Sequence, residues 1–509
     1  MKRFHPVIWG TLLLTASGVL CRCIGFFYRI FLSNTIGEEG MGLYQLSFSA
    51  AAVCTALCCT GFQTAISRLT ATTGKQPEEE RQFLRAGLLL TMSISIVVSA
   101  FFYIFAEPIA SSLLMEPRCT PLLQFYALSL PFSAIHNCLN GYYLGKQKAF
   151  MPAVSQLAEQ MIRISSILII WQIALDNGRS LTPADAMAGL FVSEVFVVLF
   201  LIPCYFVKKP PKANQYIAEH TFSFACKSIC LLAVPLIANR LVLTLLQSLE
   251  AILIPGQLRA FGHTDADALR VYGVFTGMAL PFIMFPSSVT GSAATMAMPA
   301  IAGAQSEKKS SQVLRISHSN IYFALWLGIF AGGMFLLYGI PIGTTIFKSE
   351  LAGTYLQRLS ILCPFLYLSM ILSSIINGLG KPEIIFFHNI TGLLLRLLSV
   401  IFCIPVMGME GYFTGTLLSQ ITICLLHYHY LKKHIGLPFY FRQYVFSPLL
   451  YTFLAGGISL GCYVKLASAL PKLLSLILSA VLMAAIAGIL GLHAFRKQQK
   501  VRITNFLLS

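Results

Sequence analysis

The chain has 509 residues, of which 56% are hydrophobic and only 11% are charged. Soluble proteins carry about 25% charged residues, so this composition excludes an ordinary soluble domain and indicates an integral membrane protein. The formal net charge is +17. The basic residues lie in short segments between apolar runs, a distribution typical of membrane topology. We therefore expect a lipid bilayer as partner and no nucleic acid.

The apolar runs predict an all-α polytopic membrane fold, because a crossing needs about 20 mostly apolar residues. The first run follows Lys2 and Arg3 as in a signal peptide. It is too long for one and lacks a small-residue cleavage site, so we expect it to be retained. Fourteen membrane helices are predicted, over residues 7–33, 41–67, 84–106, 120–144, 151–174, 183–207, 223–254, 269–304, 316–346, 353–379, 383–404, 409–431, 444–466 and 471–495.

Two of these segments, 223–254 and 269–304, are longer than one bilayer crossing and should tilt or bend. Proline removes a backbone donor and clashes with the preceding turn, so it provides bending points. The prolines that we expect to act in this way are Pro235, Pro281, Pro286 and Pro299.

An even number of crossings places both ends of the chain on one side of the membrane. The terminal tails and the even-numbered loops, with the adjoining Arg68 and Lys227, carry 23 of the 36 lysines and arginines, and the odd-numbered loops carry 8. Positive charge collects in cytoplasmic loops, so the sequence predicts a cell-membrane protein with both termini in the cytoplasm.

An ordered set of matches indicates that the chain contains an internal repeat. Residues 131–163 and 364–396 share a Pro-Phe pair, an Asn-Gly pair, a Gly-Lys pair and an arginine in the same order. Two six-helix lobes are predicted, at 1–207 and 223–431, with a basic linker at 208–222 and a terminal helix pair at 444–495. Because six is even, the lobes should be parallel repeats about an axis normal to the membrane.

Motifs for nucleotide binding, metal binding or nucleophilic catalysis are missing from the sequence. The 14 cysteines are mostly single residues inside apolar runs, where cysteine usually acts as a small apolar side chain. We predict no catalytic residue, no cofactor and no metal site.

Ionisable residues inside the apolar runs are the strongest functional signal. A charged side chain at a helix centre costs about 2.5–3.5 kcal/mol on insertion scales and usually faces a protein interior or a watery cavity. Arginine is also suited to phosphate, since its planar fork can donate two parallel hydrogen bonds. The candidate substrate-binding residues are Arg22, Arg29, Arg163, Arg240 and Arg396. The alternative is that each arginine pairs with a buried acid and only holds helices together.

Spacing separates the roles of these arginines. Arg22 and Arg29 are seven residues apart, so they project from one face of a helix, and Arg22 lies roughly 24 Å from a start near Pro6. Glu159 and Arg163 are four residues apart and can neutralise each other.

The embedded acids are fewer than the bases. Glu194 and Glu159 are candidates for ion coupling, because a buried carboxylate can bind a proton or sodium ion. For Glu194, a structural partner on another helix is an equal alternative. Glu250 is expected at a wet outer interface.

The run GTLLLTASGVLCRCIGFFYRIFLSNTIGEEGMGLYQLSFS (Gly10–Ser49) and the following GFQTAISRLTA (Gly61–Ala71) resemble a known family. The chain is similar to the stage V sporulation protein B branch of the polysaccharide flippases. These belong to the multidrug/oligosaccharidyl-lipid/polysaccharide exporter superfamily, with the lipid II flippases and the multidrug and toxin extruders. The resemblance covers essentially the whole chain.

This resemblance implies a flippase that carries an undecaprenyl-diphosphate-linked sugar, such as a peptidoglycan precursor, for cell-wall or spore-cortex synthesis. It also makes cell-wall synthesis proteins candidate partners. In the lipid II flippases, arginines on the first helix line a central cavity. Arg22 matches the first of them, whereas Arg29 falls one position beyond the second, where Tyr28 stands. The paired arginines of the family's second helix are absent, and no arginine lies between Val271 and Ala304.

Three other functions stay open from the sequence. A cation-coupled multidrug extruder would need acids in the cavity, for which Glu159 and Glu194 are the candidates. A membrane enzyme acting on polyprenyl-linked sugars could use only His263, Asp265 and Asp267, in one connection. The third alternative is a non-transporting scaffold in a cell-wall or spore complex.

Overall fold

A computed structural model describes residues 6–73, 77–207 and 221–507, and throughout these ranges the regular structure is helical with no strand. The predicted all-α fold is confirmed. Lys2, Arg3 and most of the predicted linker 208–222 lie outside the described residues. In the described ranges, ten helices are long and apolar enough to cross a membrane, or eleven if a bent pair counts as one crossing. This count does not confirm the predicted fourteen crossings.

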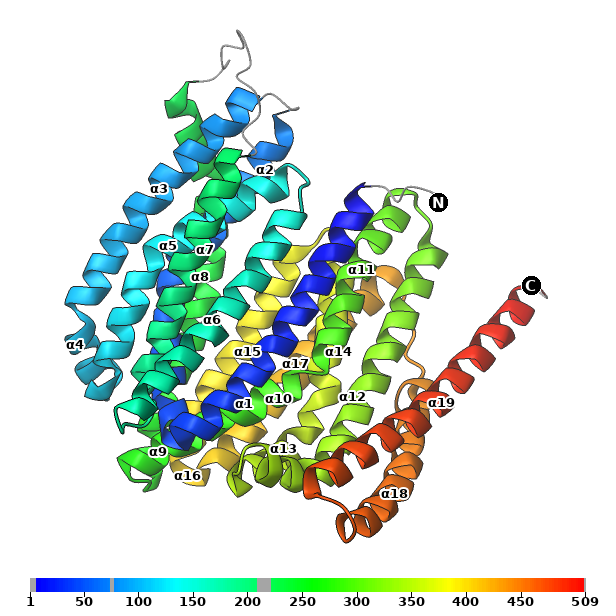
Figure 1. Ribbon diagram of the computed structural model, residues 1–509. Helices are drawn as coiled ribbons and strands as arrows, with labels where there is room; N and C mark the ends of the chain where they lie inside the picture. The colour runs from blue at the N-terminus through cyan, green and yellow to red at the C-terminus, as the bar shows by residue number, and fades with distance from the viewer. Residues whose placement is uncertain (1–5, 74–76, 208–220, 508–509) are drawn as a thin grey trace. The chain divides into compact units, whose positions relative to one another are not determined.

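The first compact unit comprises residues Met1–Gly273. Long helices run side by side in it (Figure 1). Its helices are α1 (Pro6–Thr55), η1 (Ala56–Thr60), α2 (Gly61–Thr72), α3 (Pro77–Ile104), α4 (Ala106–Pro108), η2 (Ile109–Leu113), η3 (Pro117–Cys119), α5 (Thr120–Gly145), α6 (Phe150–Asp176), α7 (Pro183–Val207), α8 (Phe222–Phe261) and α9 (Asp265–Gly273).

The second compact unit comprises residues Val274–Ser509. In it α18 and α19 pack on each other as a terminal hairpin. The predicted lobe boundary at 208–222 is a different division of the chain and stays a prediction. The helices of this unit are η4 (Val274–Ala279), α10 (Leu280–Met284), α11 (Ser287–Ser306), α12 (Ser310–Ile346), α13 (Glu350–Leu359), η5 (Ser360–Leu362), α14 (Cys363–Gly378), α15 (Pro382–Phe402), α16 (Ile404–Met407), α17 (Met409–Ile435), η6 (Arg442–Phe446), α18 (Ser447–Ala467) and α19 (Lys472–Leu507).

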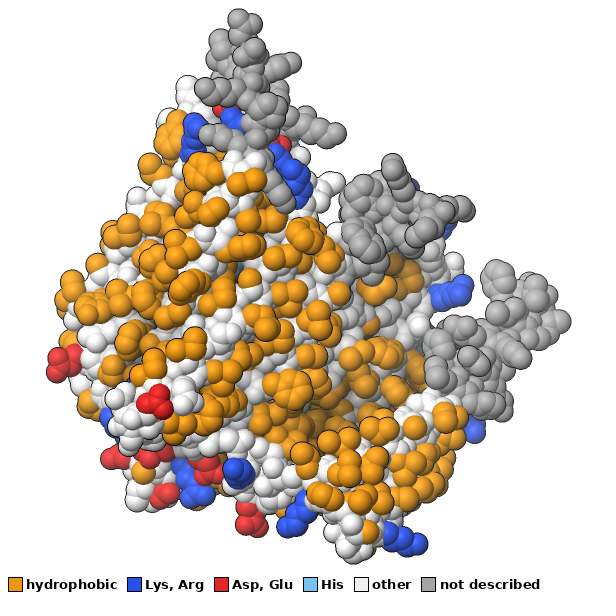
Figure 2. Space-filling model, viewed as in Figure 1, with side chains coloured by type: hydrophobic (Ala, Val, Ile, Leu, Met, Phe, Trp, Pro, Cys, Tyr) orange, Lys and Arg blue, Asp and Glu red, His pale blue; other side chains and the backbone are white. Residues whose placement is uncertain are grey.

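Each unit has its own apolar core. In the first unit the core lies among α2, α3, α5, α7 and α8, with Phe62, Ile66, Leu84, Leu139 and Ile229 as members. In the second it lies among α11, α12, α14 and η6, with Ile301, Ile321, Ile371, Ile375 and Tyr444. Hydrophobic side chains also cover most of the described helix sides on the face drawn in Figure 2. Such an apolar exterior is expected where lipid is the solvent.

Glycine sets the geometry of α1. Gly37 has φ 74° and ψ −178°, which interrupts the helix between two predicted crossings. A positive φ is favourable only for glycine, so the chain can change direction here without an intervening loop. Beyond this break, α1 packs against α9 at backbone distance. A Cβ atom on Gly42 would lie 2.2 Å from the carbonyl oxygen of Leu269.

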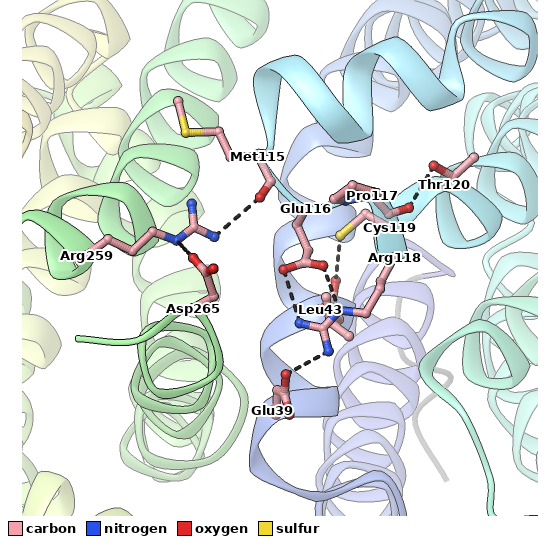
Figure 3. A network of polar contacts seen from close by, with 10 residues as sticks. All are labelled: Glu39, Leu43, Met115, Glu116, Pro117, Arg118, Cys119, Thr120, Arg259 and Asp265. Carbon is pink, nitrogen blue, oxygen red and sulfur yellow. Dashed lines mark hydrogen bonds and ion pairs between the residues drawn. The ribbon is translucent and has the colours of Figure 1, made fainter.

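Polar contacts tie the α1 break to neighbouring segments of the first unit (Figure 3). The guanidinium of Arg118 donates to Glu39 at 2.7 Å and to Glu116 at 2.6 Å. These bonds, above all the one to Glu116, raise the pKa of Arg118 above its ordinary value. Nearby, Arg259 pairs with Asp265 at 2.6 Å. Glu39, two residues beyond Gly37, is therefore tied through Arg118 to the segment that precedes α5.

The helical segment that contains Pro286 is bent at this residue, as predicted. The helices on the two sides of Phe285-Pro286 differ in direction by 54°. By contrast, α8 continues as one helix through Pro235 to Phe261. A proline position in sequence therefore marks where a helix can bend, and packing decides whether it ends there.

Candidate substrate and ion sites

Arg22 and Arg29 lie on the first half of α1. The side chain of Arg22 is exposed, and that of Arg29 is half-buried. The Arg29 guanidinium interacts electrostatically with Tyr44, Tyr28 and Arg163. Within the described ranges, no carboxylate lies within ion-pair distance of Arg22 or Arg29. The charges of these two guanidinium groups are therefore not neutralised by a described carboxylate, as an anion-binding role requires.

The other candidate arginines occupy different surroundings. Arg240, on α8 of the first unit, is exposed and likewise has no ion pair to a described carboxylate. Arg396 belongs to α15 of the second unit and is half-buried. Its backbone carbonyl accepts a hydrogen bond of 2.7 Å from Ser399. Substrate binding by these arginines stays a prediction.

Arg163 is neutralised within its own helix. Its guanidinium forms an ion pair with Glu159 one turn earlier on α6, and each side chain is 17% exposed. This is the pair predicted from the i,i+4 spacing. A contact of Arg163 with substrate would compete with this pair, so the other arginines are the better candidates for direct binding.

Glu194 lies in a buried network that joins α5, α6 and α7. Its Oε2 atom is 3.3 Å from Nδ1 of His136. The other ring nitrogen of His136 is 3.3 Å from Ser155 Oγ, and Ser155 donates to Asn140 at 3.0 Å. His136 is 5% and Glu194 9% exposed. The buried carboxylate thus has a partner from another helix, one of the two roles left open from sequence.

The donors and acceptors of this network require one proton between His136 and Glu194. The hydroxyl hydrogen of Ser155 is directed to Asn140 Oδ1 or to the Pro152 carbonyl oxygen, each 3.0 Å away, so Nε2 of His136 carries a hydrogen and donates to Ser155. Nδ1 then faces Glu194, and this contact is favourable only if one of them holds a proton. The pair is either imidazolium with carboxylate or imidazole with carboxylic acid. Both forms hold one proton between the two side chains.

A metal ion is a poorer match to these residues. One nitrogen of His136 and carboxylate oxygens of Glu159 and Glu194 all lie within 4.8 Å of one another. Glu159 is already engaged by Arg163, which leaves one imidazole and one carboxylate. A structural zinc ion takes four protein ligands and a catalytic one takes three, so proton binding accounts better for the arrangement.

Two buried residues of the first unit, Glu250 and His136, depart from what the sequence indicated. Glu250 does not lie at a wet interface: it is 4% exposed, because α8 continues past it to Phe261 and packs on α1 and α2. His136 was missed by sequence reasoning. The available signal was its position four residues before Asn140, on the same face of an otherwise apolar helix.

Several known proteins are similar to this chain in sequence or in fold. Over 453 residues the chain is 26% identical to Stage V sporulation protein B of Bacillus subtilis (strain 168), with 86% of each protein covered. It is 21% identical to lipid II flippase MurJ of the same organism, over 84% of this chain and 82% of the relative. A solved structure of lipid II flippase MurJ in an inward closed conformation shares the fold. Its TM-score is 0.71 at 14% identity, over 96% of this chain and 99% of that one.

The family assignment agrees with this fold. The polytopic helices make the chain a multi-pass membrane protein, and the relatives named lipid II flippases are transporters rather than enzymes. The sequence profile of the polysaccharide biosynthesis proteins matches residues 7–305 of this chain, which is more than half of the chain's length. The chain therefore belongs to the polysaccharide biosynthesis protein family.

Proposed function

We propose that this protein is a flippase that moves a polyprenyl-diphosphate-linked saccharide across the cytoplasmic membrane. The proposed cargo is a peptidoglycan precursor such as lipid II or a related oligosaccharide lipid, used for cell-wall or spore-cortex synthesis. The observation that carries this proposal is the pair Arg22 and Arg29 on α1. They lie in a transporter of this family and have no carboxylate partner among the residues that the structure describes.

The chemistry of the arginines suits the proposed headgroup. A diphosphate carries negative charge on oxygens that can accept bidentate hydrogen bonds from guanidinium groups. In a site shielded from water such contacts are stronger than at a surface. Arg240, Arg396 and Arg163 are further proposed ligands, with Arg163 secondary because Glu159 already binds it. Rocking between two lobes would then expose the site to each leaflet in turn, with both termini in the cytoplasm.

The first prediction concerns the cargo. Purified protein in liposomes should translocate fluorescent lipid II, or another polyprenyl-diphosphate saccharide, at least tenfold faster than empty liposomes. The physical reason is that the diphosphate is the group bound by the arginines. Accessibility of the labelled headgroup to an external quencher measures the rate.

One additional lipid makes this assay decisive. A polyprenyl saccharide with a neutral linkage, offered in the same vesicles, should not be moved. Equal rates for the neutral and diphosphate lipids, or movement of organic cations instead of either lipid, would contradict the proposed function.

We further propose that Glu194, together with His136, couples transport to ions, and that Glu159 contributes through its charge. The support is the buried contact of 3.3 Å between Glu194 and His136 and its capacity for one proton. If proton exchange at this pair drives a step of the cycle, a proton gradient should accelerate transport. Replacement of Glu194 by glutamine should abolish the acceleration, because an amide cannot exchange that proton.

This second prediction is measured as the ratio of translocation rates with and without an imposed pH gradient. We expect a ratio well above one for the wild type and close to one for Glu194→Gln. Glu250→Gln is a matched control, because it neutralises another buried acid of the same unit. It should keep the wild-type ratio. A Glu194→Gln protein that still responds to the gradient would exclude this residue from coupling.

A further inference from the structure

Two histidines in the second unit face each other between α15 and α17. His388 Nδ1 lies 2.7 Å from His427 Nδ1, and the ring centroids are 4.9 Å apart. The other nitrogen of His427, Nε2, lies 2.8 Å from the hydroxyl oxygen of Ser373 on α14. His427 is fully buried and His388 is half-buried. The three side chains form a hydrogen-bonded chain across three helices.

The short distance between the two Nδ1 atoms requires one hydrogen between them. A neutral imidazole has one N–H donor and one nitrogen acceptor. If His388 donates through Nδ1, then His427 carries its hydrogen on Nε2 and donates to Ser373. If His427 donates through Nδ1, its Nε2 accepts from the Ser373 hydroxyl. One proton gained at Nε2 of His388 and one lost from the Ser373 hydroxyl would convert the first arrangement into the second with both rings neutral at the end.

One additional proton fits this arrangement and a second does not. In the first arrangement Nε2 of His388 is an acceptor. A proton added there makes His388 an imidazolium that donates to neutral His427, and a charge-assisted bond is stronger than a neutral one. A second added proton would place two cationic N–H donors opposite each other at 2.7 Å. Such a contact has no acceptor, and the like charges repel.

The same distance is too short for a shared metal ion. Zinc–nitrogen bonds are about 2.0–2.1 Å long, so a tetrahedral zinc ion holds two ring nitrogens about 3.3 Å apart. The two Nδ1 atoms are 2.7 Å apart. A proton is therefore the ligand that this geometry accommodates without movement of the helices.

The predicted internal repeat gives independent support for a functional pair. When Asn140 is matched with Asn377, His136 falls on Ser373. When Arg163 is matched with Arg396, Ser155 falls on His388.

A histidine and a serine therefore occupy matching positions in both repeats, with their identities exchanged. In the first unit His136 and Ser155 are also in contact, at 3.3 Å. Each unit thus holds a histidine in polar contacts between helices that correspond in the predicted repeat.

We propose that His388, His427 and Ser373 form a proton-binding site that takes up one proton for the pair. Few charged groups surround it in the described sequence. On α15 these are Glu383, which pairs with Lys381 at 3.8 Å, and Arg396 two turns beyond His388. On α17 they are Glu410 in the first turn, His429 two residues beyond His427, and Lys432, Lys433 and His434 in the last turn. Helix α14 has no charged residue. The added charge is thus stabilised mainly within the pair, and the proposal does not depend on which lipid is transported.

The test follows the rings of the two histidines directly. Protein labelled with ¹³C and ¹⁵N at histidine is titrated in micelles between about pH 4.5 and 8, the range that includes ordinary histidine switching. Signals are assigned by single replacement to glutamine. His388 and His427 should titrate together with one midpoint and one proton for the pair. In His388→Gln the midpoint of His427 should move by about one pH unit or more, because strongly coupled groups titrate as a pair.

A matched replacement and the wild-type titration keep the test decisive. His434→Gln removes an exposed histidine from the end of α17 and should leave both midpoints in place. If His388→Gln does not fold, the shared midpoint in the wild type is still measurable. Separate midpoints with one proton for each ring would overturn the proposal, as would an unchanged His427 midpoint after removal of His388. Neither outcome would bear on the lipid assay.

Discussion

Replacement of both Arg22 and Arg29 by glutamine should abolish lipid translocation while folded protein still reaches the membrane. Hydrogen bonds to charged groups contribute about 1.5–3 kcal/mol each. Loss of two such contacts corresponds to a fall in rate of about 100-fold or more. Folding should be little affected, since neither guanidinium has an ion pair with a described carboxylate and Arg22 is exposed. The headgroup-accessibility assay in liposomes measures the rate, and gel filtration in detergent measures folding.

Two controls separate this effect from a general loss of positive charge. Arg315→Gln combined with Arg358→Gln removes the same charge from exposed positions near helix ends of the second unit. That protein should retain near-normal transport. Arg22→Lys with Arg29→Lys should recover only part of the activity, because lysine keeps the charge and loses the bidentate fork. Wild-type transport by the double glutamine protein would remove the proposed headgroup site.

The second large effect is expected on stability, from the ion pair of Glu159 and Arg163. Removal of one partner of a buried ion pair costs about 3–5 kcal/mol, because a buried charge is left without its counterion. Glu159→Gln should show this cost, since a guanidinium cannot lose its proton in a protein. Arg163→Gln should cost less, because a carboxylate left behind can become neutral by binding a proton. Chemical unfolding in detergent micelles measures the free energies.

The double replacement completes the comparison. With Glu159→Gln and Arg163→Gln together, no uncompensated charge remains from this pair, so stability should return most of the way to that of the wild type. Removal of the exposed contact between Lys309 and Glu307, both 59% exposed, should change stability by about 1 kcal/mol or less. If the loss of stability in the double replacement equalled the sum of the losses in the two single replacements, the two side chains would not act as a pair.

Features set by local chemistry were predictable from the sequence. The long apolar runs predicted a multi-pass helical membrane protein, because only helices or closed barrels satisfy their backbone groups in lipid. The four-residue spacing of Glu159 and Arg163 predicted their ion pair, since such residues lie on one helix face. The residues Gly10–Ala71 carry the resemblance from which the family was predicted, and the family assignment confirms that prediction.

Contacts between segments distant in the chain could not be obtained in this way. Glu194 and its partner His136 are 58 residues apart, and His388 and His427 are 39 apart. Nothing local in an apolar helix indicates which neighbouring helix a polar residue will meet. The length of α8 beyond Glu250 was also missed, because polar residues near a helix end do not show whether the helix stops.

The sequence by itself therefore determined the class of molecule, its helical composition and the positions of its embedded charges, because solvation by lipid and helix periodicity act residue by residue. Only the tertiary structure decided which of those charges meet a partner on another helix. Packing of α5 against α7 pairs Glu194 with His136, while Arg22 and Arg29 keep no described counterion. Partnership across helices depends on which faces meet, and helix packing sets that geometry.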